Sequence, residues 1–248
     1  MSADHRVATA LALLGLALGA SPSVALAAPS VQSMVVGAGG QILAGPRGVS
    51  TAATSVAVGR RRCAVAAGTP LAALANLRRL GGPAFSVRDY GRCNSAPANS
   101  ASLFVYALGG ETNVGQDGWV YKVGGVIGAT GAANTSGPRG DGRLLSSGQQ
   151  LVWFWCHAQR GGCQRTLALS AARSVSRGGR LGVSVRGYDN EGRGVPVAGA
   201  IVRLGSDFAS TNGSGRATLI APGGRGSYAL TASRRGLVPA FPETISVR

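Results

Sequence analysis

The strongest constraint on the fold comes from two short segments that alternate with a period of two, Trp119–Val126 and Gln150–Cys156. Such alternation is typical of β-strands, in which every second side chain lies on the same face of the sheet. The two segments contain all three tryptophans of the chain. Trp153 and Trp155 therefore share one face of their strand, and we expect a cluster of aromatic side chains on a single sheet.

The candidate ligand-binding residues are Trp119, Tyr121, Trp153 and Trp155. One face of their sheet has to pack on a core, so burial alone explains many of these rings. The alternative is that part of the cluster lines a groove and stacks on a ring-bearing or sugar ligand. A half-exposed tryptophan face favours binding, whereas full burial favours a scaffold. Lys122 is expected on the opposite face of the strand from Tyr121.

The N-terminal residues have the pattern of a secretory signal peptide, residues 1–27. A short basic start precedes the apolar run Val7–Ala20, and a small-x-small site ends at Ala27, before Ala28 and Pro29. The apolar run is shorter than the roughly 20 residues that a membrane-spanning helix needs. We therefore expect a cleaved, secreted protein that does not span a membrane.

The four cysteines fit the oxidising space outside the cytoplasm. No Cys-x-x-Cys pair occurs, and after cleavage His157 is the single histidine, so we expect no metal site. Of the three possible pairings we predict Cys63–Cys93 and Cys156–Cys163. The first disulfide would span the predicted helix, and the second would close a short Gly-rich loop at a strand end.

The chain has a net charge of +16, and its single lysine, Lys122, leaves arginine to supply the remaining basic charge. The shortage of Asp and Glu favours an acidic partner, such as an acidic polymer of the cell envelope. The arginines are scattered and no nucleic-acid-binding fold signature accompanies them, so we expect no nucleic-acid partner. A small ligand, of a chemistry that the sequence does not identify, is the other expected partner.

Catalytic residues are not indicated. Cys156 and His157 are adjacent, but a disulfide to Cys163 would consume the thiol that a Cys–His nucleophile needs. The acidic residues are single and well spread, without the clustering that a carboxylate pair or a Ca²⁺ loop requires. We therefore expect no enzymatic activity and no cofactor.

The expected elements divide the mature chain into a domain at 28–170, a linker at 171–178 and a second domain at 179–248. In the first domain, Thr69 and Pro70 are typical of a helix start, Leu71, Leu74, Leu77 and Leu80 form its apolar stripe, and Gly81 ends it. The predicted strands of this domain are 31–36, 54–65, 84–89, 102–108, 119–126, 150–156 and 166–170, with a Gly-rich connection through Gly48. One helix across a mixed sheet indicates an α+β fold of the β-grasp type.

The second domain has short β-prone runs between Gly, Asn and Pro turns, and no helix signal. The runs are 181–188, 200–204, 217–221, 227–232 and 243–247. This spacing predicts a small all-β sandwich of the immunoglobulin-like type, so the whole chain should be mostly β.

The segment GQDGWVYKVGGV, with Gly118, Trp119, Tyr121 and Val123, resembles a family related to the C-terminal domain of transcobalamin. That family belongs with the soluble-ligand-binding β-grasp domains. Gly148 with Trp153 and Trp155, and the run 63–74, extend the resemblance over about residues 31–170. It implies a β-grasp fold that binds a soluble ligand. Gly124 and Gln149 differ from the family pattern, and the helical domain that holds cobalamin in transcobalamin has no counterpart here, so cobalamin is not expected.

The C-terminal part resembles bacterial immunoglobulin-like and carboxypeptidase-regulatory-like sandwiches. The similar residues are Pro196–Val202, Thr211, Gly215, Ala217, Leu219 and Gly226–Ala232. The second domain contains no lysine, which excludes the internal isopeptide bond found in some relatives. The leading hypothesis is a secreted, non-catalytic module that binds a small ligand or a surface polymer. A purely structural or assembly component of the envelope is the alternative, and an enzyme ranks third.

Overall fold

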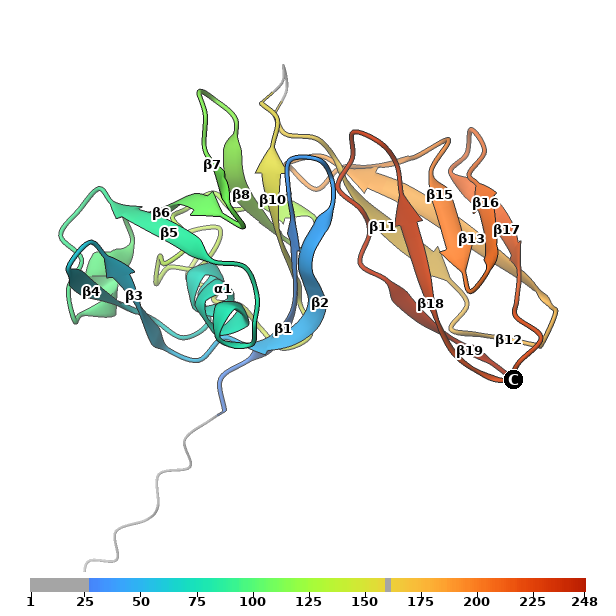
Figure 1. The fold of residues 1–248 in the computed structure, drawn as a ribbon, viewed down its shortest axis with the longest axis horizontal. Helices are drawn as coiled ribbons and strands as arrows, with labels where there is room; N and C mark the ends of the chain where they lie inside the picture. The colour runs from blue at the N-terminus through green and yellow to red at the C-terminus, as the bar shows by residue number, and fades with distance from the viewer. Residues whose placement is uncertain (1–26, 159–161) are drawn as a thin grey trace, which may run out of the picture.

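The structure is a computed structural model that describes residues 27–158 and 162–248. The predicted signal peptide therefore lies outside the described residues, apart from Ala27. The fold is mostly β, and its described part contains one α-helix, α1 (Pro70–Arg79), as predicted. Figure 1 shows two β-rich units, the first with strands β1 to β10 around α1 and the second with strands β11 to β19.

The central sheet of the first unit has the strand order β2-β1-β10-β8-β9. Its strands are β1 (Ser30–Val36), β2 (Ile42–Ser50), β8 (Gly118–Val123), β9 (Val126–Ile127) and β10 (Gln150–Cys156). β1 runs parallel to β10, and the other neighbours are antiparallel. The sheet is therefore mixed, with the first and last strands of the unit side by side at its centre.

Two sequence-based expectations about the strands are wrong. The expected Gly-rich connection through Gly48 is a turn only as far as Gln41, and from Ile42 onward the chain belongs to β2. β2 is an edge strand that pairs with β1, and its residues are mostly exposed without a regular alternation, so the sequence did not indicate a strand. The predicted strand 54–65 is a hairpin of β3 (Thr54–Val58) and β4 (Arg61–Val65). Gly59, with a φ of 58°, begins the turn between them, because this left-handed conformation favours glycine.

Helix α1 begins as its sequence predicts, and three of the four leucines of its predicted apolar stripe are buried. Thr69 Oγ1 accepts a hydrogen bond from the Ala72 N–H at 3.3 Å, and Pro70 occupies the first turn, where its missing N–H costs nothing. Leu71, Leu74 and Leu77 are fully buried. Leu80 is 48% exposed because it is the C-terminal cap rather than a member of the apolar stripe.

A second group of strands completes the core of the first unit. The three-stranded sheet has the order β5-β6-β7, and a short 3-10 helix, η1 (Pro97–Ser100), lies between β5 and β6. The strands are β5 (Phe85–Asp89), β6 (Leu103–Leu108) and β7 (Glu111–Thr112). Leu103, Val105 and Leu108 of β6 join the same core cluster as α1.

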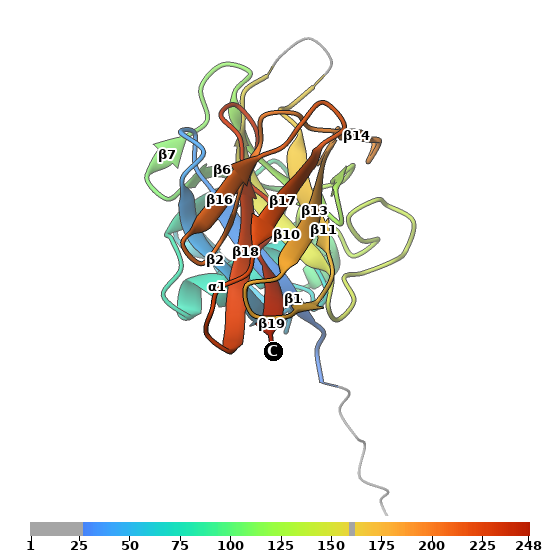
Figure 2. The ribbon, with the colours of Figure 1, turned by 90° about the vertical axis from the view of Figure 1, so that its right-hand side faces the viewer.

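The second unit is a sandwich of two sheets around one apolar core. In the first of these sheets, β13 (Arg180–Tyr188) pairs with β11 (Thr166–Ala171), β14 (Gly194–Pro196) and β17 (Arg216–Ile220). The other has the order β12-β19-β18-β15-β16. Its strands are β12 (Ser174–Val175), β15 (Ile201–Leu204), β16 (Asp207–Ser210), β18 (Gly226–Ser233) and β19 (Glu243–Val247). Figure 2 views the molecule from the side of this unit.

The strand pairing differs from the expected division at 171–178. β11, expected in the first domain, pairs along its whole length with β13 of the second unit. Within the expected linker, β12 pairs with β19. The reason is that strand pairing joins residues distant in sequence, and nothing local in the run 166–170 identifies its partner.

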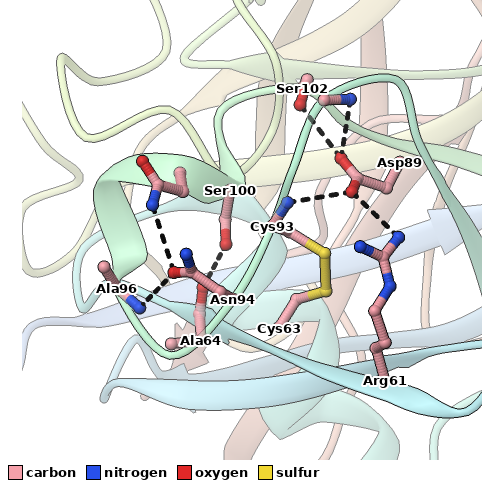
Figure 3. Close-up of a disulfide and its surroundings, with 11 residues drawn as sticks. Arg61, Cys63, Ala64, Asp89, Cys93, Asn94, Ala96, Ser100 and Ser102 are labelled. Carbon is pink, nitrogen blue, oxygen red and sulfur yellow. Dashed lines mark hydrogen bonds and ion pairs between the residues drawn. A yellow bond between two sulfur atoms is a disulfide. The ribbon is translucent and has the colours of Figure 1, made fainter.

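The two disulfides join the predicted pairs, Cys63–Cys93 and Cys156–Cys163. Beside the first disulfide, the Asp89 carboxylate accepts hydrogen bonds from the N–H groups of Gly91 and Cys93, each at 2.9 Å (Figure 3). The Cys93 N–H is the main cause that holds the pKa of Asp89 below its ordinary value, against burial, which raises it. Two disulfides indicate an oxidising, extracytoplasmic environment.

Among the described residues, no helix combines the length and apolar character that crossing a bilayer requires.

Candidate functional site

The aromatic cluster is built by the antiparallel pairing of β8 with β10. Trp153 lies opposite Tyr121, and Trp155 lies opposite Trp119. The ring centroids are 5.2 Å apart in the first pair, and 5.8 Å apart in an edge-to-face arrangement in the second. Cross-strand aromatic pairs at these distances stabilise a sheet. The structure thus brings together all four candidate residues that the sequence singled out.

All four side chains are buried, with exposed fractions of 2% to 7%. They lie on the sheet face that also contacts α1, in one core cluster with Leu71, Leu74 and Leu77. The opposite face carries Met34, Val152 and Phe154, which form a separate cluster with Val238 of the second unit. Burial of this kind favours core packing as the main role of the rings, and both faces of the sheet are covered.

One edge of the cluster nevertheless lines a pocket of about 160 Å³. Trp119, Tyr121 and Trp153 form one wall, and Leu103 and Phe104 of β6 form another. The remaining lining comes from Val105, Val120, Ile127 and the loop 128–132. Phe104 is 40% exposed and so reaches the solvent. Trp155 does not line this pocket.

The polar atoms of the pocket rings are not all satisfied. Trp119 Nε1 donates to Glu111 O at 3.0 Å, and the Tyr121 hydroxyl donates to Thr130 O at 2.9 Å. Burial raises the pKa of the Tyr121 hydroxyl above its ordinary value, so it stays protonated at neutral pH. Trp153 Nε1 is buried and has no hydrogen-bond partner among the described residues. A buried donor without an acceptor costs free energy, and native proteins contain few of them.

Two glycines allow the 128–132 loop to lie close to the Tyr121 ring and to the backbone of Ala101. A Cβ added at Gly128 would lie 2.1 Å from Cζ of Tyr121, and one added at Gly131 would lie 2.0 Å from Ala101 O. Neither position therefore accepts a side chain without movement of the neighbouring atoms. Glycine in the 128–132 segment was the sequence feature that could have indicated the pocket. The chain has 40 glycines, and only the tertiary contacts show that Gly128 and Gly131 lie where a side chain does not fit.

Lys122 is a residue whose structural role the sequence did not predict. Its side chain lies on the other face of β8 from that of Tyr121, as expected, but it is fully buried where the two units meet. Its Nζ donates to Tyr188 O and Asp189 O, each at 3.0 Å, and lies 5.7 Å from the centroid of the Phe154 ring. Removal from water lowers the pKa of Lys122 to about 8, although the carboxylates of Asp189 and Glu191 raise it.

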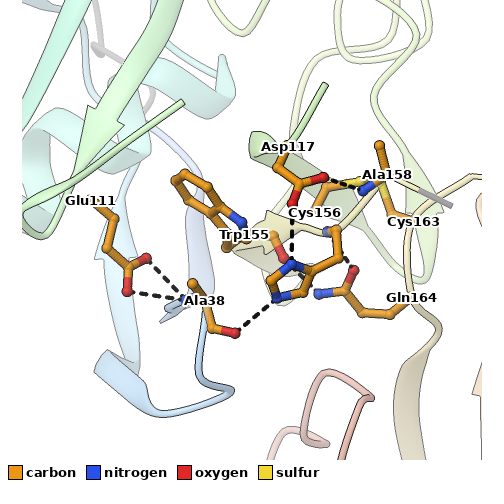
Figure 4. Close-up of polar contacts among 9 residues, drawn as sticks. Ala38, Glu111, Asp117, Trp155, Cys156, Ala158, Cys163 and Gln164 are labelled. Atoms are coloured by element: carbon orange, nitrogen blue, oxygen red, sulfur yellow. Dashed lines mark hydrogen bonds and ion pairs between the residues drawn. A yellow bond between two sulfur atoms is a disulfide. The ribbon is translucent and has the colours of Figure 1, made fainter. Parts of the chain in front are cut away.

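A polar cluster around His157 joins the β1–β2 turn, the loop before β8 and the end of β10. Figure 4 shows its partners Ala38 and Asp117. His157 Nε2 lies 2.9 Å from Ala38 O, and Nδ1 lies 3.4 Å from Asp117 Oδ2. Asp117 also accepts from the Ala158 N–H at 2.7 Å, and Glu111 accepts from the Ala38 N–H at 2.9 Å. Cys156 is held in its disulfide, so the adjacent Cys and His do not form a nucleophile–base pair. The cluster ties the β1–β2 turn and the segment between β7 and β8 to the end of β10.

The fold and these sites describe a disulfide-stabilised, mostly β protein of two units, with a ring-lined pocket in the first. The chain matches no model of a known protein family, no curated protein and no solved structure.

Proposed function

We propose that the protein is a non-catalytic binding module of the extracytoplasmic space, and that the aromatic pocket of its first unit holds a small ring-bearing ligand. The observation that carries this proposal is the unpaired Nε1–H of Trp153, in a residue that lines the pocket. Nε1 is covered in this structure, so an acceptor on the ligand would satisfy this donor once the ring or the 128–132 loop shifts, and the surrounding rings would stack on the ligand ring. An apolar cavity of about 150 Å³ accommodates one benzene ring, so about 160 Å³ suits a single ring.

The test compares pyridine with benzene, two probes of similar size that differ in one acceptor nitrogen. Ligand-observed NMR on the folded protein should show binding of both, with pyridine favoured by about fivefold, the value of one net hydrogen bond. Trp153→Phe keeps a ring but removes the donor, so this preference should disappear. Trp155→Phe is the matched control, because Trp155 is buried in the same cluster but does not line the pocket. Absence of binding at millimolar probe, or loss of the preference in both variants, contradicts the proposal.

Burial of all four aromatic side chains supports a second candidate, a structural component of the cell envelope. The closed apolar contact between the two units is in keeping with a rigid spacer. In that case neither probe binds, and substitutions in the cluster change only the free energy of unfolding.

Export is part of the proposal. The N-terminal pattern and the two disulfides support removal of residues 1–27 during secretion. Intact-mass measurement of protein recovered from outside the cytoplasm should give a chain that starts at Ala28. An N-terminus at Met1 on the exported protein would contradict cleavage.

A further inference from the structure

The outer face of the sheet formed by β17, β13 and β11 carries a different surface from the aromatic pocket. Side chains alternate along β13, with Leu181, Val183 and Val185 buried in the sandwich core. The residues between them face outward, and they are small or basic. These outward residues of β13 are Arg180, Gly182, Ser184 and Arg186.

Strand register places two serines and an arginine in one row across this face. Ser184 pairs with Ser170 of β11 on one side and with Arg216 of β17 on the other. In the next outward row, Gly182 pairs with Thr218. Gly182, Ser184 and Thr218 have short side chains or none, so the sheet surface is recessed at these positions relative to the arginines beside them.

Two open hollows of about 490 and 470 Å³ lie on this face. Both are lined by Ser184 and Arg216, so they adjoin each other on the sheet face, and we refer to the two together as the groove. Asn212 lines the first hollow, and Arg186 and Ser214 line the second. The lining therefore offers hydroxyl, amide and guanidinium groups.

The charge of the groove has one sign. No carboxylate occurs among the described residues that line either hollow. In the described chain, the guanidinium group of Arg216 forms no hydrogen bond or ion pair, whereas Arg186 donates to Gly194 O. Arg180 lines neither hollow, but it is exposed on the same face of β13, and its guanidinium group also has no hydrogen bond or ion pair among the described residues. At the β17 end, the carboxylate of Asp207 is engaged by the Ile220 N–H. Free guanidinium groups next to hydroxyls are suited to bidentate binding of carboxylates.

We propose that this groove binds an acidic polysaccharide, a sugar polymer that carries carboxylate groups. Arg180 and Arg186 are six residues apart on one strand, a span of about 20 Å, and Arg216 lies between them across the sheet. Charge distributed over this length fits an extended polymer better than a small anion. The lining contains no aromatic side chain on which nucleic-acid bases would stack, whereas its hydroxyl and amide groups match the hydroxyls of sugars. The site is independent of the aromatic pocket.

The test uses fluorescently labelled polygalacturonate, with neutral dextran and duplex DNA as comparison polymers. Fluorescence anisotropy with the full-length mature protein at low ionic strength should show binding of polygalacturonate and none of dextran. The triple variant Arg180→Gln, Arg186→Gln, Arg216→Gln should weaken binding by about tenfold or more, because it removes the charge-assisted contacts. Trp153→Phe should leave polygalacturonate binding unchanged, which separates this site from the aromatic pocket.

The matched control removes the same amount of charge elsewhere, through Arg225→Gln, Arg234→Gln and Arg235→Gln. These exposed arginines lie before and after β18, in the other sheet of the sandwich, so binding should change by less than about twofold. Thr218→Glu is a second variant that keeps every arginine and places a carboxylate in the groove. It should also weaken binding, and thermal melts verify that each variant folds.

Equal weakening by the groove and control variants would overturn the proposal, because it would indicate attraction by net charge alone. Absence of polygalacturonate binding by the unsubstituted protein would also overturn it. Tighter binding of duplex DNA that depends on the same arginines would assign the groove to nucleic acid instead.

Discussion

Replacement of Lys122 by methionine tests the buried contact between the two units through its pH dependence. The ordinary pKa of lysine is 10.5, and burial lowers that of Lys122 to about 8. Between these values the unfolded chain binds more protons at this residue than the folded chain does, so the free energy of unfolding increases as the pH rises. The cost of burying the ammonium is thus largest below pH 8 and disappears above about 10.5.

The two pKa values determine how much the free energy of unfolding changes with pH. Their difference corresponds to about 3 kcal/mol in total, of which about 2 kcal/mol falls between pH 7 and pH 9.5. Lys122→Met retains an unbranched apolar chain and has no proton to release. The free energy of unfolding of the unsubstituted protein should therefore rise by about 2 kcal/mol relative to the variant across this range.

Urea unfolding at a series of pH values, followed by tryptophan fluorescence, measures this difference. Tyr121 does not confound it, because both proteins contain that residue and the range stops below the ordinary pKa of tyrosine. A difference that stays constant with pH, or that decreases, would refute the reasoning. It would mean that Lys122 remains hydrated, and that the two units do not enclose it.

Three further experiments test the core, the disulfides and the acid stability. Trp153→Ala, at a side chain only 2% exposed, should lower the free energy of unfolding by about 3–5 kcal/mol in chemical denaturation, and a loss below about 1 kcal/mol would contradict core packing. Replacement of both Cys63 and Cys93 by Ser opens a loop of 30 residues and should lower the free energy of unfolding by about 3.5 kcal/mol. The same replacement of Cys156 and Cys163, 7 residues apart, should lower it by about 2.5 kcal/mol. A lower melting temperature for the second variant than for the first would argue against the loop-entropy account. The pKa of Asp89 is lower in the folded protein than its ordinary value of 3.8, so its ionised carboxylate stabilises the fold fully above pH 3.8, and this stabilisation is lost as the pH falls through the folded pKa. Asp89→Asn should therefore reduce the loss of unfolding free energy in this acid range. An unchanged dependence of stability on acid pH would contradict the stabilising role of the Asp89 carboxylate.

Features set by near neighbours in the chain could be predicted from the sequence. Thr69 and Pro70 define the start of α1 because capping and first-turn preferences act within one turn of helix. The alternation in β10 predicts which residues share a face, because the period of a strand follows from backbone geometry alone. The disulfide pairs were also predicted correctly, from the expected helix between Cys63 and Cys93 and the short loop between Cys156 and Cys163.

Features that depend on residues distant in the chain were decided by the tertiary structure alone. The partner of β11 is β13 rather than a strand of the first unit, and the Gly-rich segment of β2 is a strand because β1 lies beside it. The role of Lys122 appears only when β8 of the first unit meets the carbonyl groups at the end of β13. The same holds for the candidate sites. The alternation indicated the aromatic cluster, but the pocket beside it exists only because β6 supplies a second wall. Likewise, the pairing of β13 with β17 places Ser184 beside Arg216. Local preferences act over a few residues, whereas pairing and burial join residues across the whole chain.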